Sequence, residues 1–188
     1  MKKLVILDLD HTLIHSLNIK RIDIKEAFSI RLTNETFYVY TRSYLRQFID
    51  GLRKNIQEKP GVFRVAIWTA AQRDYAIKLM NVIWPQWRHE ILFLRSYEHC
   101  TVLEGGAVFK DLTKLPLGYD SILIDDNPLH FNINTANSFS VWKIRPFLFN
   151  SVDAELRDVL SYINSVVSED DNRFSIRPKT PNRLPFKY

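Results

Sequence analysis

Two aspartates that stand two positions apart, Asp8 and Asp10, are the first residues of the chain that could do chemistry. They follow the apolar run Leu4 to Leu7, which is typical of a strand buried on both faces of a parallel sheet. Burying two uncompensated carboxylates would be costly, so we expect them where the strand opens into a solvated crevice that holds a metal ion. The pattern favours Asp8 as the nucleophile of a magnesium-dependent phosphatase.

Further polar residues stand at the predicted ends of other apolar strands. Thr69 follows the run 62–68, and the pair Asp125 and Asp126 follows the run 121–124. Ligands of open α/β sheets bind beyond the carboxyl ends of the strands, and Mg²⁺ prefers a few carboxylates together with water and phosphate oxygens. In such a site Thr69 would offer a hydroxyl to a phosphate oxygen and Lys110 a positive charge, while Asp10 would protonate the leaving oxygen and later activate water.

The elements that must position these residues alternate between strands and helices, which predicts an open, mainly parallel α/β sheet flanked by helices. We expect a helix from about residue 43, capped by Ser43, to residue 55, and another from 71 to 84. A last helix, capped by Asp153, should run to residue 167. The expected strands cover residues 4–7, 62–68, 91–94, 121–124 and 139–144, with a turn within 103–109. Two more strands, 27–32 and 36–40, predict a small inserted ribbon.

Composition bounds the class of protein. The 188 residues predict one domain, residues 1–167, followed by a basic, proline-containing flexible tail, residues 168–188. No apolar run approaches about 18 residues, so no membrane span is expected. Cys100 is the single cysteine, which excludes an internal disulfide and fits a reducing compartment, cytoplasmic or nuclear. The net charge of +5 is consistent both with a nucleic-acid contact and with a solvated tail.

The same residues resemble the haloacid-dehalogenase superfamily, whose signature is Asp-x-Asp-x-Thr, then Thr, then Lys, then an acidic pair. The stretch from Val5 to Ser16 is similar to the signature of the FCP/SCP-type phosphatases, which act on the C-terminal domain of RNA polymerase II and on other phosphoproteins. Further similar segments are 37–39, 44–52, 68–71 with 75–76, 93–95, 109–112 and 124–128. The resemblance covers about residues 3 to 167 and implies a Rossmann-like fold of the haloacid-dehalogenase type.

The resemblance assigns roles in the chemistry. It implies that Asp8 forms an aspartyl-phosphate, and that Asp10 is the general acid and base and lends its backbone carbonyl to Mg²⁺. Asp126 would complete the metal site, and Asp125 would be a ligand or would hold metal-bound water.

It also implies four contacts with the substrate. Thr69 and Lys110 would bind the phosphoryl group, Arg95 would contact the substrate near the phosphate, and Tyr75 matches an aromatic position at the pocket. His11 stands where the family often has Glu, and we expect it to be a spectator. The short ribbon predicts no large cap domain, and an open site favours a phosphorylated segment of a macromolecule.

Three hypotheses follow. The preferred one is a monomeric protein serine/threonine phosphatase. The second is a phosphatase of nucleic-acid ends or nucleotides, which the positive charge motivates. The third is a binding module that keeps the fold without catalysis.

Overall fold

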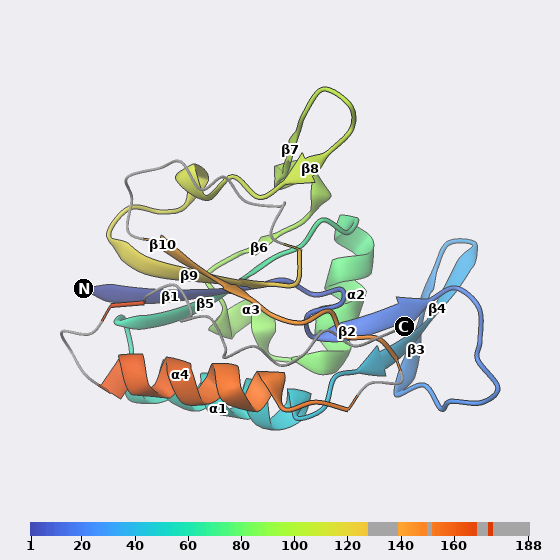
Figure 1. Ribbon diagram of the computed structural model, residues 1–188, viewed down its shortest axis with the longest axis horizontal. Helices are drawn as coiled ribbons and strands as arrows, with labels where there is room; N and C mark the ends of the chain where they lie inside the picture. Colours follow the sequence, from blue (N-terminus) through green and yellow to red (C-terminus); the bar gives the residue numbers. More distant parts are fainter. Residues whose placement is uncertain (128–138, 150–151, 169–172, 175–188) are drawn as a thin grey trace, which may run out of the picture.

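The computed structural model describes residues 1–127, 139–149, 152–168 and 173–174. Its centre is a five-stranded sheet in which all neighbouring strands are parallel, as the sequence predicts (Figure 1). In spatial order the strands are β10 (Phe139–Lys143), β9 (Tyr119–Asp125), β1 (Lys2–Leu7), β5 (Phe63–Trp68) and β6 (Leu94–Arg95). The predicted strand 91–94 is therefore shorter and lies later in the chain than expected.

Strand β1 lies in the middle of the sheet and is buried on both faces. Val5 and Leu7 belong to the larger hydrophobic core, whereas Leu4 and Ile6 belong to a smaller core on the other side. Because side chains of a strand alternate between faces, a continuous apolar run is needed to fill both cores. The opening run of the sequence thus predicts β1 correctly.

Helices cover one face of this sheet. The helices α1 (Leu45–Glu58), α2 (Arg73–Ile83), α3 (Trp87–Glu90) and α4 (Glu155–Ser168) all contribute to the larger core. Helices α1 and α4 lie side by side (Figure 1), and a Cβ atom at Gly51 would lie 2.6 Å from Leu160 Cδ2. Glycine at this position therefore permits the close approach of the two helices.

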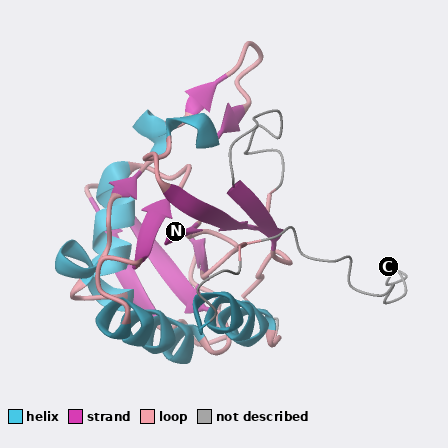
Figure 2. Ribbon diagram, turned by 90° about the vertical axis from the view of Figure 1, so that its left-hand side faces the viewer, coloured by secondary structure: helices cyan, strands magenta, loops and turns pink. Residues whose placement is uncertain are grey.

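The opposite face is covered by the segment between β6 and β9. It contains two short 3₁₀ helices, η1 (Tyr97–His99) and η2 (Leu112–Lys114), and the hairpin of β7 (Thr101–Val102) and β8 (Val108–Phe109). The hairpin projects from the domain on the side away from α1 and α4 (Figure 2). It corresponds to the turn expected within residues 103–109.

A second, antiparallel sheet stands beside the carboxyl ends of the main strands. Its strands are β2 (Ile14–Leu17), β4 (Glu35–Thr41) and β3 (Phe28–Leu32), in that spatial order. Two of them form the predicted ribbon, whereas β2 was not predicted because a stretch of four residues with two polar ones carries little periodic signal. The ribbon is small and no large cap domain occurs in the described part of the chain.

The sequence predicts side-chain caps at the N-termini of α1 and α4, and the structure shows only the second of these contacts. Ser43 does not cap α1, because the helix begins at Leu45 and its N-cap is Tyr44, which has a left-handed backbone (φ 64°) and makes no side-chain cap bond. Asp153 does act at the start of α4, where its Oδ1 accepts the N–H of Glu155 at 3.1 Å.

Most of the predicted flexible tail, residues 168–188, lies outside the described residues, so its boundary stays a prediction. Phe174 is nevertheless packed against the sheet, with 6% of its surface exposed. Its N–H donates to Asp120 Oδ2 at 2.9 Å, and its carbonyl accepts from Ser140 Oγ at 2.9 Å. Within the described ranges, none of the helices combines the length and the apolar character that crossing a membrane requires.

Candidate active site

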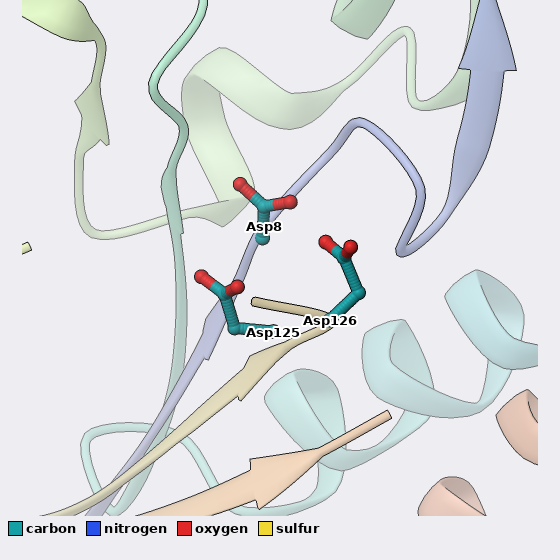
Figure 3. Close-up of side chains that lie close together, drawn as sticks. All are labelled: Asp8, Asp125 and Asp126. Carbon is teal, nitrogen blue, oxygen red and sulfur yellow. The ribbon is translucent and has the colours of Figure 1, made fainter. Parts of the chain in front are cut away.

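Three carboxylates meet at the carboxyl ends of β1 and β9. Asp8 directly follows β1, Asp125 is the last residue of β9, and Asp126 comes next. One carboxylate oxygen of each lies within 4.8 Å of the others (Figure 3). The two strands are neighbours, and the N–H of Asp8 donates to the carbonyl of Ile124 at 3.0 Å, so the sheet itself fixes this spacing.

Lys110 lies between two of these carboxylates. Its fully buried ammonium donates to Asp8 Oδ1 at 2.5 Å and to Asp125 Oδ2 at 2.6 Å. Burial alone lowers the pKa of Lys110, but the two carboxylates outweigh burial and raise it. Lys110 is therefore a permanent positive charge that directly follows β8.

A single lysine does not balance the acidic groups around it. Burial, with a smaller contribution from the Asp125 charge, raises the pKa of Asp8 to about 8, although Lys110 opposes this rise. Burial also raises the pKa of Asp10 and of Asp126. The carboxylates would ionise fully only with more positive charge nearby. Closely spaced carboxylate oxygens are the donors that a hard cation such as Mg²⁺ takes, so Asp8, Asp125 and Asp126 fit a magnesium ion.

Asp10 points to a different partner. The hydroxyl of Tyr75 donates to Asp10 Oδ1 at 2.7 Å and lies 2.8 Å from Ser16 Oγ. The Tyr75 ring packs edge-on against Phe37 of the small sheet, with 5.4 Å between the ring centroids. Tyr75 thus lies beside Asp10 and holds one of its oxygens in place, whereas its contact with substrate stays a prediction.

The turn after Asp10 has an unusual backbone. His11 adopts a left-handed conformation (φ 59°), and its carbonyl accepts the N–H of Phe147 at 2.6 Å. His11 Nδ1 is 3.1 Å from Nδ1 of His15 and 3.3 Å from the carbonyl oxygen of Phe147. Thr12 Oγ1 donates to Asp126 Oδ1 at 3.5 Å, a long contact. His11 therefore shapes the turn through its backbone.

Thr69 and Arg95 lie at the neighbouring ends of β5 and β6, where the N–H of Thr69 donates to the carbonyl of Arg95 at 3.0 Å. The buried Thr69 hydroxyl accepts the N–H of Ala71 at 3.0 Å, which leaves its own proton available. The Arg95 guanidinium lies over the rings of Trp68 and Phe93 and donates to the carbonyl of Lys114 at 3.0 Å. Within the described ranges neither side chain bonds to the site carboxylates, so their contacts with substrate stay predictions.

Two residues around the site were missed in the sequence. Ser16 stands in the quoted motif but was given no role, and it bonds to Tyr75. Arg42 is fully buried and bonds to the turn after Asp10. A charged residue between a strand and a helix usually faces solvent, so its position gave no signal.

Comparison with known proteins agrees with this geometry. The family model for the NLI interacting factor-like phosphatase matches residues 3–173. "CTD small phosphatase-like protein 2" of Dictyostelium discoideum is 28% identical over 176 residues, which are 93% of this chain and 29% of that protein. "CTD small phosphatase-like protein 3" of Caenorhabditis elegans is 29% identical over 165 residues, 86% of this chain and 53% of that protein. The chain thus spans about half or less of these two relatives.

The solved structure of Fcp1, described as an essential RNA polymerase II CTD phosphatase, has the same fold. It superimposes with a TM-score of 0.56 at 18% identity and covers 90% of this chain and 54% of that one. The predicted fold class, of the haloacid-dehalogenase type, is therefore confirmed. With nearly the whole described domain matched by the family model, the chain belongs to the NLI interacting factor-like phosphatases.

Proposed function

We propose that this chain is a Mg²⁺-dependent phosphatase that works through an aspartyl-phosphate on Asp8 and removes phosphate from phosphoserine or phosphothreonine in proteins. The observation that carries the proposal is the group of Asp8, Asp125 and Asp126 within 4.8 Å, with Lys110 buried between the first two. A phosphoryl group carries negative charge, and this group has the cation and the metal ligands to receive it.

Each residue has a part in the proposed reaction. Lys110 holds Oδ1 of Asp8, which leaves the second oxygen of that carboxylate to attack phosphorus. Asp10, oriented by Tyr75, gives its proton to the leaving oxygen and afterwards takes one from water. A bound Mg²⁺ would supply positive charge to the phosphoryl oxygens and would favour the ionised form of Asp8.

The substrate class rests on different support. In the described chain the site has a small sheet beside it and no large cap, which suits a phosphorylated segment of a larger molecule. The relatives are named as CTD phosphatase-like proteins, and the Fcp1 structure is titled a phosphatase of the RNA polymerase II CTD. We therefore place phosphoproteins before nucleic acids as substrates.

Replacing Asp8 by Asn tests the chemistry. Asp8→Asn should reduce hydrolysis of p-nitrophenyl phosphate and of phosphoserine peptides by at least about 10⁴-fold, because the nucleophile is lost. Asp120→Asn is the matched control. Asp120 is buried like Asp8, but it belongs to β9 and lies at the opposite end of the sheet. Undiminished turnover in Asp8→Asn would contradict the proposal.

A nucleic-acid-end or nucleotide phosphatase is the second candidate, which the net charge of +5 favours. Removal of residues 168–188 should then weaken activity on oligonucleotide phosphates in a salt-dependent way. Activity on phosphopeptides alone would exclude this candidate. A binding module without catalysis would show no turnover of any phosphoester in the presence of Mg²⁺.

A further inference from the structure

A buried arginine outside the reacting groups joins three separate segments around the site. Arg42 follows β4, and none of the surface of its side chain is exposed. Its guanidinium pairs with Asp153, with Nε 3.0 Å from Oδ1 and Nη2 2.9 Å from Oδ2. Such a two-point pair fixes the plane of the guanidinium.

The remaining donors of Arg42 reach two backbone carbonyls. Nη1 donates to the carbonyl of Thr12 at 3.0 Å, and Nη2 donates to the carbonyl of Arg145 at 2.7 Å. The guanidinium also lies over the ring of Phe147, 5.7 Å from its centroid. One side chain thus contacts the turn after Asp10, the segment after β10 and Asp153, which lies two residues before the start of α4.

The turn Asp10–Thr12, whose last carbonyl accepts from Arg42, contains a residue with a left-handed backbone. Thr12 stands two residues after Asp10, and its hydroxyl is 3.5 Å from Asp126. Between them His11 has a left-handed backbone, and its carbonyl accepts from Phe147, whose ring lies against Arg42. A left-handed residue other than glycine is strained and persists only where its surroundings hold it.

We propose that Arg42 is a positioning residue of the phosphatase reaction, which holds the Asp10–Thr12 turn against the segment 145–147 so that Asp10 faces the substrate. The inference rests on the proposed function, because a loss of positioning is measured through turnover. Lysine could not replace the contact, since its three donors radiate from one atom and cannot form a planar fork to a carboxylate and two carbonyls.

The test separates positioning from stability. The double variant Arg42→Met with Asp153→Asn removes both charges of the pair and keeps an acceptor for the N–H of Glu155. We expect kcat per folded molecule to fall about tenfold to a hundredfold, with KM changed less than about threefold, because the reacting groups are displaced while substrate binding remains. Arg42→Lys should fold and give a smaller loss of kcat.

Lys3→Met is the matched control, because it breaks another buried pair, Lys3 with Asp120, at the far end of the same sheet. It should lower the denaturant midpoint and leave kcat per folded molecule unchanged. Wild-type kcat in either Arg42 variant, or a loss that the unfolded fraction fully explains, would overturn the inference. Failure of the proposed function would look different, since turnover would then be absent in the wild type or would persist in Asp8→Asn.

Discussion

The two ends of the central sheet each bury a lysine against aspartate, and strands β1 and β9 contribute to the charges at both ends. At the amino end, Lys3 of β1 pairs with Asp120 of β9 at 2.8 Å. At the carboxyl end, Lys110 lies between Asp8 and Asp125, which follow or end the same strands. The amino-end pair has one charge of each sign, whereas the carboxyl end has Asp10 and Asp126 in addition.

This difference separates a group of charges that stabilises the fold from one that is built to react. Asp120 Oδ2 accepts from Lys3 and from the N–H of Phe174, so the charge of this carboxylate is paired with that of one lysine. At the carboxyl end the carboxyls have a raised pKa because burial disfavours their charge. A bound cation would stabilise such an excess of acid, so the carboxyl end has the charge arrangement of a candidate functional site.

The largest expected effect is the loss of kcat in a variant of Lys110, which we compare with a variant of Lys3. Lys110→Met should reduce kcat about 10²- to 10³-fold, because a fixed charge beside the nucleophile is lost. Lys3→Met should instead lower the free energy of unfolding by about 3 kcal/mol, since Asp120 is left buried with a single N–H donor, and should leave kcat unchanged. Steady-state kinetics and urea unfolding of both variants measure these effects. Wild-type kcat in Lys110→Met, or a large loss of kcat in folded Lys3→Met, would contradict the assignment of stability to the amino end of the sheet and of reactivity to its carboxyl end.

A smaller effect is expected from Mg²⁺ itself. At a hundred times its Kd, Mg²⁺ should raise the free energy of unfolding by about 2.7 kcal/mol, because it binds the folded chain at Asp8, Asp125 and Asp126. Thermal unfolding with Mg²⁺ and with EDTA measures this shift. Asp126→Asn should reduce the shift and Asp120→Asn should not, so an equal shift in all three proteins would place the metal elsewhere.

The smallest effect concerns pH in the absence of metal. The pKa of Asp8 is about 8 in the folded chain against an ordinary 3.8, and the pKa values of Asp10 and Asp126 are also raised. Between those values the folded chain holds more protons than the unfolded chain, so stability falls as pH rises. From pH 6 to pH 7 the loss is at most about 1.4 kcal/mol for each proton involved. Urea midpoints measured in EDTA should show this slope, and Asp8→Asn should flatten it; a rising midpoint would contradict the raised pKa of Asp8.

The sequence predicts the centre of this molecule well because its signals there are local. The run Leu4 to Leu7 reads as a strand buried on both faces, and acids at the ends of parallel strands must meet at one edge of the sheet. In the fold β1 and β9 are neighbours, which brings Asp8 and Asp125 together. Lys110 was expected to supply a positive charge to the phosphate, and its place between Asp8 and Asp125 is visible only in three dimensions.

The parts that could not be predicted depend on contacts distant in the sequence. Arg42 and Asp153 are 111 residues apart, and nothing near either residue indicates the other. The N-cap of α1 is Tyr44 and not the expected Ser43, although serine is the more favourable N-cap residue. The left-handed backbone of His11 leaves no pattern in the neighbouring residues, so this turn was not predicted, and the expectation that His11 is a spectator in the reaction stays a prediction.

The central position of β1 also has a consequence for synthesis. This strand is synthesised before both of its neighbours, β5 and β9. A further 117 residues must be added after Lys3 before its partner Asp120 has been synthesised. At ribosomal rates of about 5–20 residues per second, that interval is about 6 to 23 seconds. During this interval the apolar β1 lacks at least one of its neighbouring strands, and no fragment that ends before Asp125 can assemble the site.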